Sequence, residues 1–205
     1  ILGEYTFGCG HGMKNFGIVA IGNGLGNALF TRGKLYHGNN GFAGELGHIC
    51  AVDNGRQCNC GRKGCLERYV AGPGIVLTAR EVLEENDAPS LMRDLDQMTA
   101  QAIAECCDRG DELAIEVYRR TGYILGIALA NYAAIVDPEA LILSGGVSRA
   151  GKWLIEPTLK SFGEHVFPNI HGRVKLLISS MNHRERDILG ASVMAWGVKE
   201  YSLFK

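Results

Sequence analysis

The chain has 205 residues, which suffice for one large domain or two small lobes with a sizeable buried core. Its apolar fraction of 46% and formal net charge of −1 are typical of a soluble globular protein and argue against a basic nucleic-acid surface on this segment. No run of about 18 apolar residues is present, so the sequence predicts no membrane-spanning helix.

The first half of the chain predicts a β-hairpin followed by a loop. Residues 1–4 do not begin with Met and look like the middle of an element, so we expect a segment of a longer protein. Apolar residues 16–21 and residues 28–31 predict two strands, joined by a glycine-rich turn at residues 22–26. After a further turn at Arg32 and Gly33, the four glycines of residues 38–47 predict a loop.

The second half predicts helices and then alternating strands and helices. Asp137 and Pro138 should end the longest helix, because the residue before proline disfavours helical geometry. Asp187 is expected near the N-cap of the last helix. The predicted elements are helical segments from residue 67 to 70 and 76–85, a turn at 86–90, helices at 99–108 and 111–135, a buried strand at 140–147 ending in two glycines, a helix at 151–166, a strand at 174–179 and a helix at 187–198. This order predicts an α/β fold.

Three of the seven cysteines, Cys58, Cys60 and Cys65, lie within eight residues, and His48 precedes them by ten positions. Zinc prefers four such ligands at tetrahedral corners, and a closed set of one histidine and three cysteines leaves no position for water. We therefore predict a structural zinc site; the alternative is three oxidation-prone thiols in an exposed loop. The odd cysteine count argues against a disulfide framework and favours a reducing, cytoplasmic setting. The remaining cysteines are interpreted as buried or spare thiols: Cys9, Cys50, Cys106 and Cys107.

Two carboxylates flank the predicted metal ligands. Glu45 comes three residues before His48, and Glu67 comes two residues after Cys65. Taken singly, Glu45 is interpreted as a solvated loop acid and Glu67 as a helix N-terminal acid favoured by the dipole. Their placement around the metal instead predicts fixed acceptors for the hydroxyls of a sugar.

The segment "GFAGELGHICAVDNGRQCNCGRKGCLE", residues 41–67, closely resembles the signature of the ROK family of bacterial sugar kinases, sugar-responsive repressors and N-acetylmannosamine kinases. The likeness extends over nearly the whole chain through "GEYTFGCGHGMKNF", "LILSGGV" and "RDILGAS". The segments "TAREVLE", "PSLMRD" and "TGYILGIALAN" look most like glucokinases of this family. The resemblance implies that residues 1–205 form a single C-terminal lobe of the actin-like, ribonuclease-H-like ATPase fold, without the N-terminal lobe.

The resemblance also implies roles for individual residues. The residues matching sugar-binding positions are Glu45, His48 and Glu67. Those matching zinc ligands are His48, Cys58, Cys60 and Cys65, so that one imidazole nitrogen would bind the metal and the other would face the sugar. Those matching a phosphate-contacting loop are Gly22, Asn23, Gly24 and Gly26, which by themselves indicate only a hairpin turn. Those matching the turn beside the nucleotide are Gly145 and Gly146, which are equally typical of a strand-to-helix turn.

The chain departs from the family's kinases in two respects. It lacks the Asp-x-Gly-Gly-Thr loop that holds ATP, and the catalytic Asp, the general base, is expected upstream of Ile1. The "NDAP" at residues 86–89 is interpreted as a turn rather than as this site. Asn23 stands where kinases usually have Thr, which favours the repressors.

Three functions follow from these observations. The first is the sugar-binding lobe of an ATP- and Mg²⁺-dependent hexose kinase, with glucose as the expected substrate and no turnover by this chain alone. The second is the sugar-sensing domain of a repressor, in which a helix-turn-helix would precede this segment. The third is a zinc-stabilised interaction lobe without a ligand. We expect a cytoplasmic homodimer or tetramer whose present segment contacts neither membrane nor nucleic acid.

Overall fold

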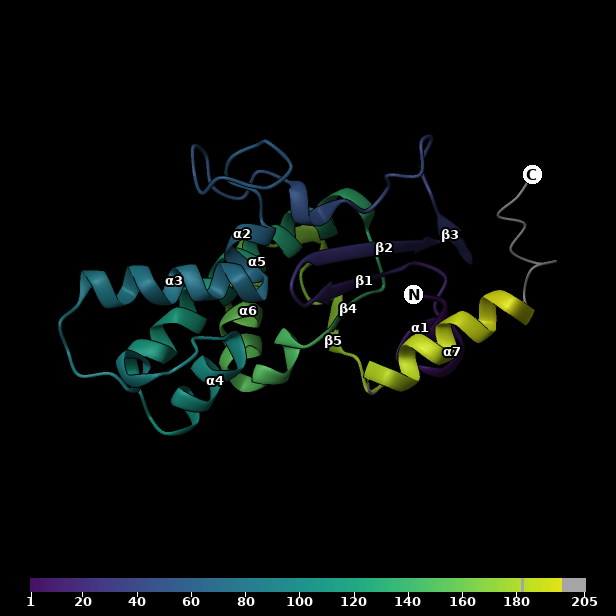
Figure 1. The fold of residues 1–205 in the computed structure, drawn as a ribbon. Helices are drawn as coiled ribbons and strands as arrows, with labels where there is room; N and C mark the ends of the chain where they lie inside the picture. The colour runs from purple at the N-terminus through teal and green to yellow at the C-terminus, as the bar shows by residue number, and fades with distance from the viewer. Residues whose placement is uncertain (182, 197–205) are drawn as a thin grey trace.

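The computed structural model describes residues 1–181 and 183–196, and its centre is a five-stranded mixed sheet (Figure 1). The strands are β1 (Phe16–Ile21), β2 (Leu25–Thr31), β3 (Lys34–Tyr36), β4 (Ala140–Ser144) and β5 (Lys175–Ile178). Their order across the sheet is β3-β2-β1-β4-β5. β2 runs antiparallel to both β1 and β3, whereas β4 lies between β1 and β5 and runs parallel to both. The α/β prediction is confirmed.

Helices cover both faces of this sheet. They are α1 (Leu2–Phe7), α2 (Glu67–Val70), α3 (Gly72–Glu85), α4 (Ala100–Asp108), α5 (Glu112–Val136), α6 (Lys152–His165) and α7 (His183–Trp196). α3 to α6 pack together on one side, and α1 and α7 lie side by side on the other (Figure 1). Among the described helices, none combines the length and the apolar character needed to cross a membrane.

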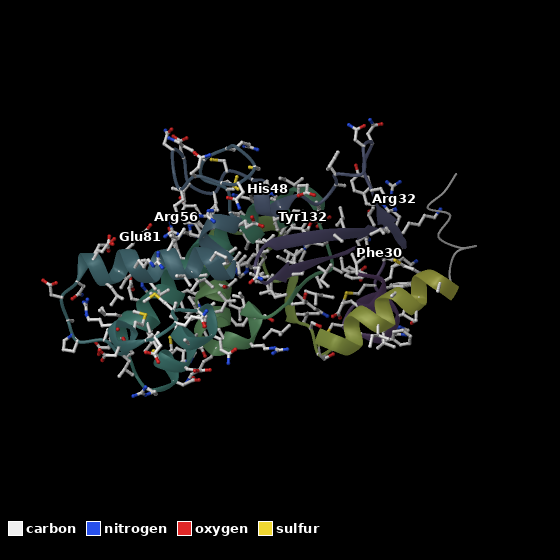
Figure 2. The ribbon with its side chains drawn as sticks, viewed as in Figure 1. Phe30, Arg32, His48, Arg56, Glu81 and Tyr132 are labelled. Atoms are coloured by element: carbon white, nitrogen blue, oxygen red, sulfur yellow. The ribbon has the colours of Figure 1, made fainter. Side chains whose placement is uncertain are left out.

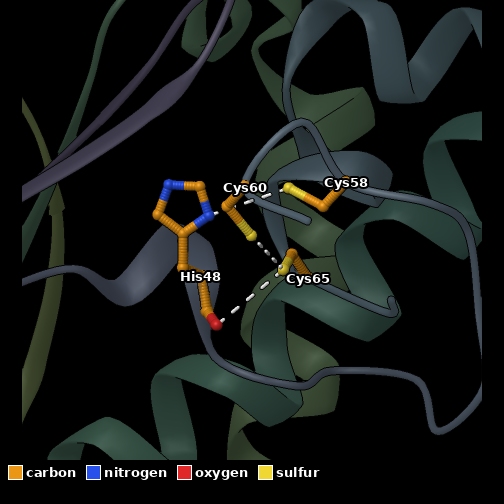
Figure 3. Close-up of side chains that lie close together, drawn as sticks. All are labelled: His48, Cys58, Cys60 and Cys65. Atoms are coloured by element: carbon orange, nitrogen blue, oxygen red, sulfur yellow. Dashed lines mark hydrogen bonds between the residues drawn. The ribbon is translucent and has the colours of Figure 1, made fainter. Parts of the chain in front are cut away.

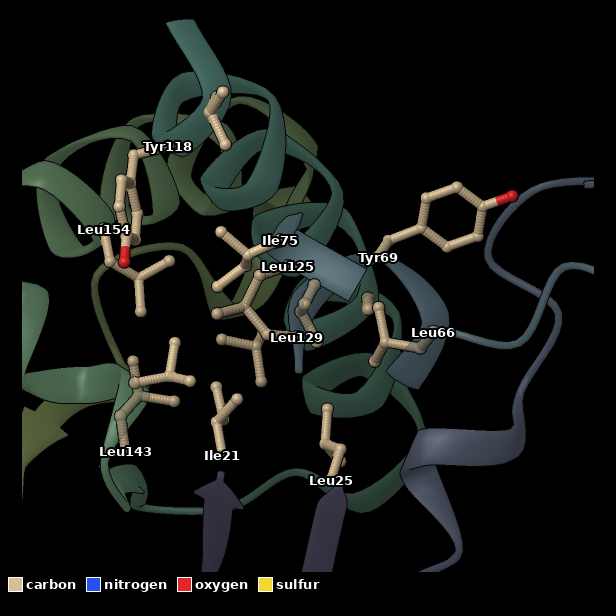
Figure 4. Close-up of a cluster of buried hydrophobic side chains, with 14 of the residues drawn as sticks. Ile21, Leu25, Leu66, Tyr69, Ile75, Tyr118, Leu125, Leu129, Leu143 and Leu154 are labelled. Atoms are coloured by element: carbon tan, nitrogen blue, oxygen red, sulfur yellow. The ribbon is translucent and has the colours of Figure 1, made fainter. Parts of the chain in front are cut away.

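The alternation of side chains along the strands produces two hydrophobic cores. Ile21 and Leu143 point toward Leu125 and Leu129 of α5 in the larger core (Figure 4). The residues facing α1 form the smaller core, which includes Leu2, Phe16, Phe30 and Ile142. The large core holds the carboxyl ends of β1 and β4 against α5, so the loops that follow these strands start from a rigid base.

Most predicted elements are confirmed within a residue or two, and several differ. α3 begins at Gly72, four residues earlier than predicted, and β4 ends at Ser144, three residues before the predicted end at residue 147. The last helix begins at His183, four residues earlier than predicted, so Asp187 lies inside α7 rather than near its N-cap; the predicted end at Val198 is outside the described residues. β2 begins at Leu25, so Gly26 belongs to the strand and pairs with Ala20 instead of lying in the turn. The sequence reasoning missed α1 and β3, whose few residues are too short for a periodic pattern.

Asp111 caps the N-terminus of α5. Its Oδ1 accepts hydrogen bonds from the backbone N–H groups of Leu113 (3.0 Å) and Ala114 (3.1 Å). Its Oδ2 accepts from the Ser90 hydroxyl (2.8 Å) and the Leu91 N–H (2.6 Å), which ties the preceding loop to the same carboxylate. We therefore expect Asp111→Ala to lower the free energy of unfolding by about 2 kcal/mol in urea titrations.

This cap also makes stability depend on pH. Burial raises the pKa of Asp111, but the hydrogen bonds outweigh burial and hold the pKa below its usual value. A lowered folded-state pKa contributes stability above the unfolded-state pKa of about 3.9 that is lost as pH falls through the folded-state value. The stability difference between the wild type and Asp111→Ala should therefore shrink below about pH 4. Glu112→Ala, at an exposed neighbouring position, is the control; an equal effect from it would contradict the assignment.

Candidate functional site

Four predicted metal ligands converge in the structure (Figure 3). His48 ends a short 3-10 turn (Leu46–His48), and the cysteines lie in the loop of residues 48–65, here called the cysteine loop. The Nδ1 of His48 is 3.7 Å from the Sγ of Cys58, the Sγ atoms of Cys60 and Cys65 are 3.6 Å apart, and all four ligand atoms lie within 4.8 Å of one another. A zinc–sulfur bond of about 2.3 Å implies tetrahedral edges of about 3.8 Å. The cluster therefore fits a zinc ion, and its donor types are those of a structural site.

Backbone pairing folds the cysteine loop back on itself. The N–H of Ala51 donates to the carbonyl of Gly64 at 2.8 Å, and the N–H of Leu66 donates to that of Ile49 at 3.0 Å. Gly64 has φ +76°, and a Cβ placed there would lie 1.8 Å from the Val52 carbonyl oxygen. Only glycine therefore allows this turn, which brings Cys65 back beside His48.

The thiols of the cluster differ in acidity. A hydrogen bond with the Arg62 backbone lowers the pKa of Cys60 to about 7, whereas burial raises the pKa of Cys65 to about 12. Zinc ligates thiolates and releases the protons as it binds. Cys60 is therefore the more acidic of these two thiols, and zinc binding would displace the proton of each.

Glu67 lies against the turn between β1 and β2. As the first residue of α2, it is half-buried, and its Oε2 accepts a hydrogen bond from the N–H of Leu25 at 2.8 Å. The same oxygen lies 2.8 Å from the Cβ position of Gly24. This bond uses one carboxylate oxygen, and a carboxylate has a second that can accept from another donor.

The segment that carries Glu45 and His48 packs on the same strand end. Glu45 is exposed and begins the 3-10 turn, its carbonyl accepting from the His48 N–H at 3.0 Å. Between them, Gly47 lies so close to β2 that a Cβ there would be 2.7 Å from the Leu25 carbonyl oxygen. In Figure 3 the Nδ1 of His48 faces the sulfurs and the Nε2 points away from them. The structure thus brings the segments of Glu45, His48 and Glu67 to one place, the start of β2.

Both predicted glycine turns lie at this edge of the sheet. The N–H of Gly22 donates to the Gly24 carbonyl at 2.9 Å, with Asn23 exposed between them. Gly145, which follows β4, has φ +95°, and its Cβ position lies 2.3 Å from the carbonyl oxygen of Ile21, the last residue of β1. Ligands of open α/β sheets bind outside the carboxyl ends of parallel strands, which is where these turns meet.

Gly145→Ala tests this close approach. The added methyl group would clash with Ile21 in a backbone conformation that alanine disfavours, so the free energy of unfolding should fall by about 3 kcal/mol in denaturant titrations. Gly146→Ala is the matched control, because no atom lies within 4 Å of its Cβ position and its φ is −63°. Equal destabilisation by the two variants would show that the contact between the turns is not what matters.

Sequence reasoning missed two polar groups near this edge. Asn27 donates from Nδ2 to the carbonyl of Ile18 (2.7 Å) and accepts from the hydroxyl of Tyr132 on α5 (2.9 Å; Tyr132 is labelled in Figure 2). The hydroxyl of Ser144, at the end of β4, is buried and has no hydrogen-bond partner among the described residues. Both residues border a cavity of about 480 Å³ beside α1 and α7. A serine in an apolar strand and an asparagine in a hairpin carry no sequence signal of such a cavity.

The sequence of this chain is similar to those of sugar kinases and of sugar-related repressors. The chain is 34% identical over 203 residues to a glucokinase of Halalkalibacterium halodurans, covering 97% of this chain and 60% of that protein. It is 27% identical over 183 residues to the DNA-binding transcriptional dual regulator NagC of Escherichia coli, covering 89% of this chain and 45% of the regulator. The chain therefore spans about 60% of the length of the glucokinase it resembles.

Solved structures give the same two classes. A ROK family glucokinase from Streptomyces griseus, in complex with glucose and AMPPNP, superposes with a TM-score of 0.84 at 30% identity, covering 94% of this chain and 64% of that one. A ROK family transcriptional regulator, a homologue of the E. coli Mlc protein, superposes with a TM-score of 0.83 at 28% identity, covering 95% and 49%. The fold is thus the actin-like ATPase fold of ROK sugar kinases, as expected. Because the family model described as ROK matches residues 1–197, the chain belongs to the ROK family.

Proposed function

We propose that this chain is the C-terminal, sugar-binding lobe of an ATP-dependent hexose kinase whose substrate is glucose. The observation that carries the proposal is the hydrogen bond between Glu67 and the N–H of Leu25, because it holds a sugar-binding candidate against the glycine turn that would contact phosphate. The similarity to glucokinases, one of them solved with glucose and AMPPNP, supports the same assignment.

In this proposal, each group has a simple chemical task. Glu45, the Nε2 of His48 and the free oxygen of Glu67 accept hydrogen bonds from sugar hydroxyls and so orient the hexose. The cysteine loop holds these groups still, and bound zinc supplies only structural cross-linking there. The turn of Gly22, Asn23, Gly24 and Gly26 contacts the phosphates, where small residues let the backbone approach closely, and Gly145 and Gly146 leave room for the nucleotide.

The phosphoryl transfer itself needs groups beyond these residues. ATP and Mg²⁺, when bound, supply the phosphoryl group and neutralise its developing charge. The general base that takes the proton from the attacking hydroxyl is proposed to be an aspartate in the part of the whole protein that precedes Ile1. On this proposal, the 205-residue chain binds sugar and has no turnover.

The second candidate is a sugar-sensing repressor domain. Asn23, exposed in the first glycine turn where Thr is expected, favours this candidate, as does the similarity to NagC. The pocket would then respond to sugar without transferring phosphate.

Two measurements separate these functions. The first is hexose-dependent ADP release by the whole protein that contains this chain, with D-glucose first in the panel. The second is the melting temperature of the chain with each hexose, since binding to the folded state raises stability. Turnover with glucose supports the kinase, and binding without turnover supports the repressor. A flat response of both assays would reject both in favour of an interaction lobe without a ligand.

A further inference from the structure

Arg56, a residue of the cysteine loop, reaches out of that loop to the junction of α2 and α3 (Figure 2). Its Nη1 donates to the carbonyl oxygens of Arg68 (2.7 Å) and Gly74 (3.0 Å). Only 14% of its side chain is exposed. Its guanidinium therefore binds one main-chain acceptor in α2 and one in α3, and it ties the cysteine loop to both helices.

Further contacts hold the same side chain and its backbone. Nη2 donates to the hydroxyl of Thr78 at 2.9 Å, and Nε donates to Glu81 of α3 at 2.9 Å. The guanidinium carbon lies 4.5 Å from the centre of the Tyr69 ring, and the N–H of Arg56 donates to the Tyr69 hydroxyl at 2.8 Å. A planar guanidinium can make all these contacts at once, whereas a lysine ammonium cannot fork between two carbonyls while stacking on a ring.

The contacts connect the metal cluster to Glu67. Arg68 follows Glu67 directly, so holding its carbonyl sets the position of α2 at its first turn. Glu67 in turn holds the N–H of Leu25. A continuous path of hydrogen bonds and chain therefore runs from the cysteine loop, through Arg56 and α2, to the glycine turn.

We propose that Arg56 is a positioning residue that fixes Glu67 in its bond with Leu25 once the cysteine loop is folded around its metal. Arg56 does not itself touch the sugar. Its effect on sugar affinity rests on the function proposed above, whereas its effect on the Leu25 amide does not.

The test uses the zinc-loaded chain and reads the hydrogen exchange of the Leu25 amide, with D-glucose affinity measured in parallel. In Arg56→Met we expect protection of this amide to fall and the glucose Kd to rise, each about tenfold, or about 1.4 kcal/mol, with zinc stoichiometry unchanged. Arg56→Lys should restore part of the amide protection and part of the glucose affinity. It keeps the positive charge near Glu81 but loses the forked guanidinium that binds both carbonyls.

Two control variants each remove an ion pair but keep the hydrogen bond from Arg56 to the Arg68 carbonyl in α2. Arg119→Met breaks an ion pair with Glu116 on α5 and should leave the Leu25 amide unchanged. Glu81→Gln weakens the half-exposed ion pair with Arg56 while leaving both carbonyl contacts, and should have a small effect.

The outcomes are distinct. Unchanged protection of the Leu25 amide in folded, zinc-loaded Arg56→Met would overturn the proposal. If that variant does not fold, Arg56→Lys is judged by the same amide, and wild-type protection there would overturn it equally. Loss of amide protection in a chain whose wild type binds no hexose would support the role of Arg56 and reject the proposed function.

Discussion

Replacing Cys65 by serine is expected to abolish zinc binding and to lower the melting temperature of the chain by at least about 10 °C. Cys65 is fully buried, and its Sγ lies 3.6 Å from the Sγ of Cys60. It precedes the start of α2 by two residues. Because structural zinc contributes its binding free energy to folding, losing one of four ligands removes much of the stability of the cysteine loop. Zinc content by atomic absorption should fall from one ion per chain to none, and the melting transition should shift with it.

Cys50→Ser is the matched control for this prediction. Cys50 is exposed and pairs with Cys65 across the loop, but it is outside the four-residue cluster, so zinc content and melting temperature should both be retained. A Cys65→Ser protein that keeps stoichiometric zinc, or metal-free wild type that melts at the same temperature as the zinc-loaded form, would contradict a structural zinc site.

Replacing Glu67 by glutamine is expected to weaken D-glucose binding about thirtyfold, or about 2 kcal/mol, which is the typical contribution of a hydrogen bond to a charged group. The amide keeps the size of the side chain but loses its charge, which weakens the hydrogen bonds it accepts. Isothermal titration of the zinc-loaded chain with glucose measures the change. The zinc content should stay at the wild-type level, because Glu67 is outside the metal cluster.

Glu139→Gln provides a matched control at the opposite end of the sheet. The Oε1 of Glu139 accepts hydrogen bonds from the N–H groups of Lys14 (2.8 Å) and Asn15 (3.0 Å), a carboxylate-to-backbone contact like that of Glu67 with Leu25. Replacing Glu139 by glutamine should leave the glucose affinity unchanged. Wild-type glucose affinity in Glu67→Gln, or equal weakening in both variants, would exclude Glu67 as a direct sugar ligand.

Features that depend on near neighbours in the chain were predictable from the sequence. The long apolar pattern after Asp111 predicted α5, and the spacing of Cys58, Cys60 and Cys65 predicted the metal cluster. In each case the interacting groups belong to one continuous helix or one loop of the chain, with His48 and Cys65 only 17 residues apart. The predicted start of α7 was wrong because this local signal is missing there. Residues 183–187 are all polar, so no hydrophobic periodicity marks the helix before Ile188.

Contacts between distant parts of the chain were decided only by the tertiary structure. Glu67 and Leu25 are 42 residues apart, Tyr132 and Asn27 are 105 apart, and nothing in their local sequence indicates that they meet. Local patterns determine which face of an element is apolar, and hence that a sheet and covering helices form. Which side chains then meet depends on strand order and on how the helices pack. The sequence alone therefore determined the α/β class and the candidate metal ligands, whereas the packing of α2 and α5 against β1 and β2 placed Glu67 at the glycine turn.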